Sequence, residues 1–427
     1  MKAGNTIKIA AVFFLLFQKI PGYTQDQQKQ SLTLEDCYER AQANYPLVKK
    51  RTLIQKSKEY SIDNVAKGYL PQLSLNGQVT YQSTVTQIPI DVPGMEVPQL
   101  SKDQYKFYGE LNQSIYDGGE MKEKKEMQRV GSAVEEQNIA VELYLLKERV
   151  NQLFFGILLA NEQLRQNTLL IKDIDLGINK IQGAIRHGTA LKSNADVLRA
   201  EHLKASQQRV ELIATHKAYL DMLGLFLNQD LGTNTQLIKP LPKMFSSEIN
   251  RPELNLFDHQ LHQIDSREAA IHARNRPKLD FFFQGGYGRP ALNILRPRFE
   301  AYYIGGLRIR WNIAGLYTAG KEKALLANER LEIEADRETF FFNTHYKMKQ
   351  EEAMIRRYDD LLKSDDEIVA LRQKIKNTSM AQLENGIIHT SDYLREVHAE
   401  DQARLNKIIH EIQLLSSQYS HQYTTGN

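Results

Sequence analysis

The chain has 427 residues, of which 25% are charged and 41% hydrophobic, and its formal net charge is +3. This composition is too apolar for a disordered chain, and no basic stripe along the sequence indicates nucleic acid as a partner. The single cysteine, Cys37, excludes an intramolecular disulfide, and a small packing residue is the simplest role for it.

The N-terminus has the parts of a signal peptide. Lys2 and Lys8 supply positive charge, residues 9–17 (IAAVFFLLF) form a short apolar core, and a polar run follows. These nine residues are too few to cross a bilayer, so we expect residues 1–24 to be a cleaved leader rather than an anchor. No other stretch approaches about 18 apolar residues, which excludes an α-helical membrane protein.

The sequence contains an internal duplication. The motif at 44–46 (NYP) recurs at 250–252 (NRP), and each copy begins a helical run that ends at a proline. Further on, 196–199 (DVLR) recurs at 392–395 (DYLR), each time after a glycine. This predicts two copies of one unit (helix, two strands, long helix, turn, long helix), over residues 25–230 and 231–427.

Four segments alternate apolar and polar residues with period two, the pattern of a strand with two different faces. They form two predicted hairpins, at 72–116 and 278–313. Each segment has roughly ten to fifteen residues, the length that a tilted strand needs to cross a bilayer. The apolar faces would then meet lipid, and the polar faces would line water with the charged residues Lys106, Glu110, Asp280, Arg308 and Arg310.

The alternative for these strands is a soluble β-sandwich with one solvent-exposed face. However, the rest of the chain has no other predicted strands on which such a sheet could pack. In lipid, a four-stranded sheet leaves two edges with unpaired backbone groups. Barrels closed by one chain have at least about eight strands, so several copies of this chain would have to share a barrel. The segments 85–103 and 289–298 would be loops at its outer end.

The remaining segments are helical. Residues 120–186 and 321–383 contain no proline, and apolar residues recur in them at steps of three and four. At 1.5 Å per residue, each helix would be about 100 Å long. Such a rod cannot bury its apolar stripe on itself, so we expect long helix pairs at about 120–230 and 318–422, with the partner helices at about 193–224 and 391–422.

In order, spacing and duplication, these pieces resemble the TolC-like outer-membrane efflux protein family over nearly the whole mature chain. The matching pieces are LTLEDCYERAQANYP, YLPQLSLNGQ, LNQSIYDGG, RWNIAG, HGTALKSNADVLRAEH and ENGIIHTSDYLREVH. The resemblance implies a homotrimer with a shared transmembrane β-barrel, in the lipid of the outer membrane, that continues into a long α-helical periplasmic barrel. It also implies two partners, a periplasmic adaptor (membrane fusion protein) and an inner-membrane pump.

The resemblance also assigns roles to the turns that join the two helices of each long pair, which we call the two tips. Gly188 and Gly386 match the turn glycines where adaptors dock. Asp392 matches an aspartate at the narrowest part of the closed tunnel, where three-fold symmetry would make a carboxylate ring that attracts cations. With it, the predicted pore constriction comprises Asp392, Arg395, Asp196 and Arg199.

The tip departs from the family pattern at three positions. The best-known member has a second aspartate where this chain has Arg395. It also has an arginine and a tyrosine that lock the closed state, where this chain has Ile388 and Leu383. An Asp392–Arg395 ring could therefore be weakly selective or close differently.

A purely structural role is the alternative for the tip residues. Ser193 and Ser391 are good N-caps, and an aspartate in the first turn suits the helix dipole. The arginines three residues on could pair locally with these aspartates, and the glycines could be helix C-caps with positive φ.

No sequence pattern indicates a catalytic, metal-binding or phosphate-binding site. His259 and His262 have helical ligand spacing but no cysteine or carboxylate cluster beside them, and no phosphate-binding loop or nucleophile–base arrangement occurs. We therefore predict no catalytic residues, no metal and no cofactor. The predicted function is passive conduction of small molecules as the outer-membrane channel of a tripartite export system. The alternatives are a duct for type I protein secretion and a non-transport coiled-coil scaffold of the envelope.

Overall fold

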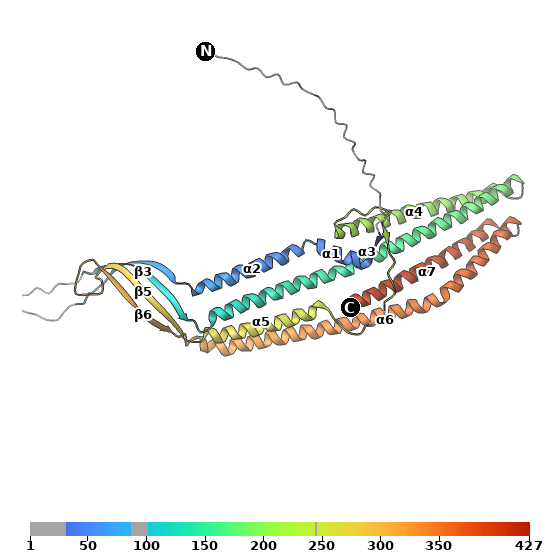
Figure 1. Cartoon of the computed structure of the whole chain (residues 1–427). Coiled ribbons are helices and arrows are strands. Elements are labelled where there is room, and N and C mark those ends of the chain that lie inside the picture. Colours follow the sequence, from blue (N-terminus) through green and yellow to red (C-terminus); the bar gives the residue numbers. More distant parts are fainter. Residues whose placement is uncertain (1–30, 87–100, 244–245) are drawn as a thin grey trace, which may run out of the picture.

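The computed structural model describes residues 31–86, 101–243 and 246–427. The predicted signal peptide, and most of the predicted loop at 85–103, lie outside these residues. The molecule is elongated. A β-sheet lies at one end, and the two tips, where paired long helices are joined, lie at the other (Figure 1).

All four predicted strands are present. They form one antiparallel sheet in the order β2-β3-β5-β6, so the two hairpins meet through β3 and β5. The last strand stops three residues before its predicted end at Ile313, because the backbone turns there into a long helix. The strands are β2 (Gln72–Tyr81), β3 (Asp103–Tyr116), β5 (Lys278–Arg289) and β6 (Glu300–Arg310).

The two faces of this sheet differ in how far they enclose their side chains. On the apolar face, Leu75 and Ile309 are 74% and 76% exposed, whereas Asp280 on the polar face is only 6% exposed. In a sheet that covered a soluble core, the apolar side chains would be the enclosed ones. On β5 and β6 the polar face is thus the more covered of the two, and we call the polar side of the sheet the concave face.

Two long helices run from the sheet to the far end of the molecule (Figure 1). They are α3 (Glu120–Arg186), of 67 residues, and α6 (Gly315–Glu384), of 70 residues, so each is about 100 Å long. The strand before α3 ends at a tight turn in which Gly118 and Gly119 both have positive φ. Asp117 then accepts hydrogen bonds from the backbone N–H groups of Gly119 and Met121, which satisfies donors at the helix start.

Shorter helices pack along these two rods. Near the tips, α4 (Lys192–Leu227) returns along α3, and α7 (Thr390–Thr425) returns along α6 and also contacts α3. Nearer the sheet, α2 (Val48–Ala66) packs on α3, and α5 (Pro252–Arg274) packs on α3 and α6. The two long helix pairs are therefore α3 with α4 and α6 with α7.

Each returning helix is continued end-on by a second helix. Asn44, the last residue of α1 (Leu34–Asn44), donates from Nδ2 to the Leu227 carbonyl at 2.9 Å. Asn250, just before α5, donates its backbone N–H to the Thr425 carbonyl at 2.6 Å. The two junctions use matching asparagines of the two predicted repeats, and along the molecule α2 follows α4 while α5 follows α7 (Figure 1).

The two larger apolar clusters join several of the rods. One lies at mid-length, where β1 (Ser31–Leu32) pairs with β4 (Gln236–Leu237), and it includes Cys37, which is fully buried as a packing residue. The other lies nearer the tips and joins α3, α4, α6 and α7; its members include Ile174, Leu198, Leu383, Tyr393 and Val397.

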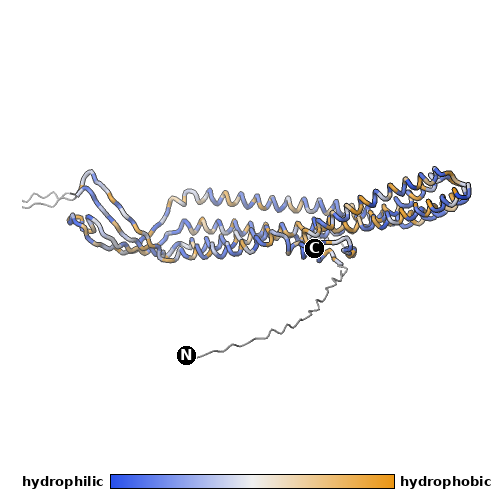
Figure 2. Tube along the Cα trace, turned by 90° about the horizontal axis from the view of Figure 1, so that it is seen from above, coloured by the Kyte–Doolittle hydropathy of each residue, from blue (hydrophilic) through white to orange (hydrophobic). Residues whose placement is uncertain are grey.

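Hydrophobic and hydrophilic residues alternate along the strands and helices (Figure 2). Among the described residues, no helix combines the length and apolarity that a bilayer crossing requires.

Candidate functional site

The concave face of the sheet carries all five charged residues predicted to line water. Cross-strand neighbours share a face, and the register places Lys106 opposite Gly288, Glu110 opposite Gln284, and Asp280 opposite Arg308. These side chains thus project to one side, although they come from three strands.

Hydrogen bonds across the strands fix most of these charges. Glu110 accepts from Asn112 Nδ2 and Gln284 Nε2, both at 2.9 Å, and from Arg308 Nη1 at 3.5 Å. Arg310 Nε donates to Asp280 Oδ2 at 2.8 Å. Lys106 makes no ion pair with any described residue. The face is therefore polar and nearly neutral, as suits a surface in contact with water.

The two tip turns have the same geometry. Gly188 and Gly386 have φ of 75° and 68°, in the left-handed region that favours glycine. Gly188 N–H donates to the Ile185 carbonyl at 3.0 Å, and the next N–H, of Thr189, reaches Ala184 at 2.9 Å. Gly386 and Ile387 repeat this pattern on α6. Both turns are Schellman motifs, so the structural role expected of the glycines as C-caps is confirmed.

The predicted serine N-caps are wrong. The caps are Leu191 and His389, whose extended backbone leads directly into α4 and α7, so Ser193 and Ser391 lie within the first turn. Asp392 supplies the capping interaction, because its Oδ2 accepts the His389 backbone N–H at 3.2 Å.

Each tip aspartate pairs with the arginine three residues on. Asp196 Oδ1 lies 3.7 Å from Arg199 Nη1, and Asp392 Oδ1 lies 3.5 Å from Arg395 Nη1. Among the described residues, no ion pair joins one of these pairs to the other. One chain therefore presents two separate Asp–Arg pairs near its tips, and their assignment to a constriction stays a prediction.

The first tip also has a basic cavity of about 450 Å³ between α3 and α4. Arg186, Lys192 and Arg199 line it, with Asp196 as the acidic residue. At the second tip, Leu383 is buried and Ile388 packs against the same apolar cluster.

Sequence reasoning missed a buried ionic cluster above the tips. Lys376 of α6 lies 2.6 Å from Asp173 of α3 and 3.4 Å from Glu400 of α7, and all three helices are thereby tied together. Nearby, Gln166 donates to Asp401 at 2.9 Å, yet burial raises the pKa of the Asp401 carboxyl. No sequence signal could have found this cluster, because Asp173 and Lys376 are 203 residues apart.

A second buried acid lies on α6 close to the end of α7. Glu351 is 5% exposed and accepts a hydrogen bond from Thr424 Oγ1 at 2.9 Å. Burial raises its pKa to about 7, although the Thr424 bond and the Lys347 ammonium act in the opposite direction.

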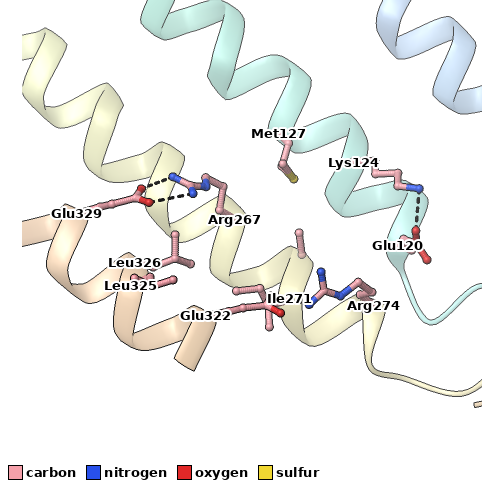
Figure 3. Close-up of a pocket in the computed structure, with 11 residues that line it drawn as sticks. Glu120, Lys124, Met127, Arg267, Ile271, Arg274, Glu322, Leu325, Leu326 and Glu329 are labelled. Atoms are coloured by element: carbon pink, nitrogen blue, oxygen red, sulfur yellow. Dashed lines mark hydrogen bonds and ion pairs between the residues drawn. The ribbon is translucent and has the colours of Figure 1, made fainter. Parts of the chain in front are cut away.

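A cavity of about 380 Å³ lies between α3, α5 and α6, on the sheet side of the rods (Figure 3). Its apolar floor includes Ile271 and Leu326, and its rim is charged. Figure 3 shows Arg267 of α5 paired with Glu329 of α6, and Lys124 paired with Glu120 along α3. Because the rim charges are paired with one another, the arrangement matches a gap between packed helices better than a ligand site.

Solved structures match this fold, whereas no family model and no curated protein matches the sequence. The outer membrane protein VceC from Vibrio cholerae aligns with TM-score 0.67 and 9% identity, over 92% of this chain and 96% of that one. The CmeC outer membrane channel of Campylobacter jejuni aligns with TM-score 0.65 and 15% identity, over 92% and 85%. The open state of the Neisseria gonorrhoeae MtrE channel gives 0.65 and 13%, over 92% and 89%. The chain therefore has the fold of outer-membrane channels.

Proposed function

We propose that this chain, which has the fold of the TolC-like channels, is the outer-membrane component of a tripartite export system and passively conducts small molecules. The observation that carries the proposal is the sheet: its apolar face is exposed, and the charged and hydrogen-bonded side chains gather on the opposite face. That arrangement suits lipid outside and water inside, and a coiled-coil scaffold has no use for it. The outer membrane is accordingly the proposed location, with the helices in the periplasm.

Three copies would complete the barrel. The edge strands β2 and β6 have one strand neighbour each in the sheet, and a membrane cannot hydrate their free backbone groups. Joining β6 of one copy to β2 of the next closes twelve strands in a homotrimer. The outer helices would meet in the same way, and exposed apolar residues on α2 and α6, such as Tyr60 and Phe342, would be buried there.

The tips are the proposed contact with a periplasmic adaptor, which would link the channel to an inner-membrane pump. Both tips project furthest from the sheet, and the rigid Schellman turns hold them in defined shapes (Figure 1). The basic cavity beside Gly188 offers donors for a partner's acidic groups. Export energy would come from the pump, because the proposed role of this chain is a passive duct.

The first test is the single-channel conductance of the purified oligomer in planar bilayers. We expect discrete openings, and we expect Asp392→Ala to lower cation preference because a ring of three carboxylates is lost. Asp196→Ala tests the duplicated position by the same measurement, and Arg209→Ala, further from the turn on α4, is the control.

Openings that do not respond to Asp392→Ala or Asp196→Ala would keep the duct and reduce these aspartates to helix-start residues. A folded, membrane-inserted oligomer that never conducts, even after the tips are loosened by Gly188→Pro, would support the scaffold alternative instead.

A further inference from the structure

A small polar cavity lies inside the helical part of the molecule, between α3, α4 and α7. Its volume is about 50 Å³, which gives room for a small ion and one or two water molecules. Asn167 of α3 and Asp401 of α7 line it and are 3% and 9% exposed, whereas Gln208 of α4 lines it and is exposed. The cavity therefore extends from the interior of the chain towards its surface.

Asn167 presents an oxygen atom without a partner. Its Nδ2 donates to the Ala205 carbonyl at 3.0 Å, and because a carbonyl can only accept, this bond fixes which end of the amide is the oxygen. The Asn167 Oδ1 atom is enclosed and accepts no hydrogen bond from any described residue. A buried acceptor that stays unpaired is costly, so this oxygen requires a donor or a cation.

Asp401 is a buried carboxyl that makes no ion pair with any described residue. Gln166 Nε2 donates to its Oδ1 at 2.9 Å, which leaves most of its acceptor capacity unused. Burial raises the pKa of this carboxyl, and so do the charges of Glu400 and Asp173, whereas the Gln166 bond and His398 lower it. A positive charge on the cavity side would therefore stabilise the ionised form.

The fixed cations near Asp401 are paired with other carboxylates. Lys376 Nζ lies 2.6 Å from Asp173 and 3.4 Å from Glu400, and Arg404 also contacts Glu400. These two cations balance these two carboxylates. An ionised Asp401 thus gives the cluster one excess negative charge.

His398, the remaining charged neighbour, faces another carboxylate. Its Nε2 lies 3.2 Å from Glu201 of α4, and its side chain is 43% exposed. It does not line the cavity. Its charge is therefore directed to Glu201 and to solvent, and it does not replace a cation beside Asp401.

We propose that this cavity binds one alkali cation, Na⁺ or K⁺, between the Asp401 carboxylate and Asn167 Oδ1. Amide oxygens of Gln163 and Gln208, together with water, would complete its shell. Oxygen donors suit a hard cation, and one carboxylate suits a single charge, since Ca²⁺ takes about six to eight oxygen ligands. The bound ion would link α4 to α3 and α7. Sequence analysis predicted no metal, because the donors of this site come from three helices.

The test is urea denaturation of the solubilised full-length protein at constant ionic strength. NaCl or KCl is mixed with N-methyl-D-glucamine chloride, whose organic cation is too large for the cavity. Above the dissociation constant, each tenfold rise in the concentration of the alkali cation should lower the unfolding equilibrium constant about tenfold per chain. The salt that acts at the lower concentration identifies the ion.

Three variants assign the effect to the cavity. Asp401→Asn should abolish the dependence on the cation, and Asn167→Ala should shift it to at least about tenfold higher concentration. Asp366→Asn alters an exposed aspartate of α6 that pairs with Lys407, and it should keep the dependence of the unaltered protein. Because salts are compared within each variant, a change in overall stability does not affect the result.

Equal stability in the three chlorides would overturn the proposal and leave a proton or water beside Asp401. A dependence on Na⁺ or K⁺ that survives Asp401→Asn would overturn it as well. Conductance does not enter either result, so the proposed channel function is tested separately.

Discussion

At the scale of single residues, burial changes the chemistry of a few acids. Glu351 of α6 is buried near the end of α7, and Thr424 donates a hydrogen bond to it. Glu352, the next residue along the chain, instead pairs with Lys349 and Arg356 at the surface. Adjacent glutamates thus differ in whether their charge is favoured, because successive residues of a helix point in different directions.

Glu351 should make the protein more stable in acid. Its pKa is about 7 in the folded chain and 4.5 in its ordinary state, so the folded state holds the proton more tightly. This contribution is complete below pH 4.5 and is lost as the pH rises through 7. Glu351→Gln should therefore raise the free energy of unfolding at pH 8 by about 3 kcal/mol and flatten its pH dependence.

The measurement is urea denaturation of the solubilised protein between pH 4 and 8. Glu352→Gln is the control and should give no gain at pH 8. Equal effects of the two substitutions would show that burial of Glu351 is not the cause.

At the scale of elements, the helices are joined by a few polar contacts that no single helix specifies. Lys376 is the clearest case, because its side chain is 12% exposed and it meets carboxylates from α3 and α7 at once. Glu400, which is 3% exposed, also pairs with Arg404. Breaking a buried pair is costly because the remaining charge keeps its desolvation penalty.

Lys376→Met should destabilise the junction of α3, α6 and α7 by about 3 kcal/mol, since Asp173 loses its cation and Glu400 loses one of two. Hydrogen exchange should be faster in the tip-proximal halves of these helices, with little change near the sheet. Lys363→Met removes an exposed partner of Asp360 on the same helix, and it should leave exchange unchanged. If Lys376→Met changed hydrogen exchange uniformly along α3, Lys376 would not be a local link between the helices.

At the scale of the whole molecule, one chain is incomplete. The sheet has two free edges, and its apolar face is exposed along the whole hairpin pair. The helical rods likewise expose apolar residues on α2 and α6 at the outer sides of the layer. A closed assembly in a membrane would cover all three surfaces, which is why assembly and insertion belong to the same proposal.

Neighbouring residues of β2 test which face meets lipid. Leu75→Arg places a charge on the apolar face, at a cost of about 2–4 kcal/mol near the bilayer centre, and should reduce the amount of membrane-inserted oligomer. Ser74→Arg places the same charge on the concave face and should insert normally. Heat-modifiable oligomer bands of isolated membranes would measure both, and equal loss for the two variants would contradict the assignment of faces.

Local sequence patterns determined the elements. Period-two alternation predicted four strands, helical periodicity without proline predicted the long rods, and the glycines before the duplicated DVLR and DYLR motifs marked the tips. Each of these signals depends on residues close in the chain, because strand faces, helix stripes and turns are set by neighbouring residues. The charged residues of the polar face were predicted for the same reason.

Only the tertiary structure decided which residues meet across elements. The helices α4 and α7 begin one residue before the serines that were predicted to cap them. Their N-caps are therefore Leu191 and His389. The bond between Glu110 and Arg308, the burial of Glu351 and the tie at Lys376 join residues far apart in the chain. Sequence periodicity gives the face on which a side chain lies, but contacts between faces depend on register, curvature and side-chain reach, which are fixed only when the elements pack.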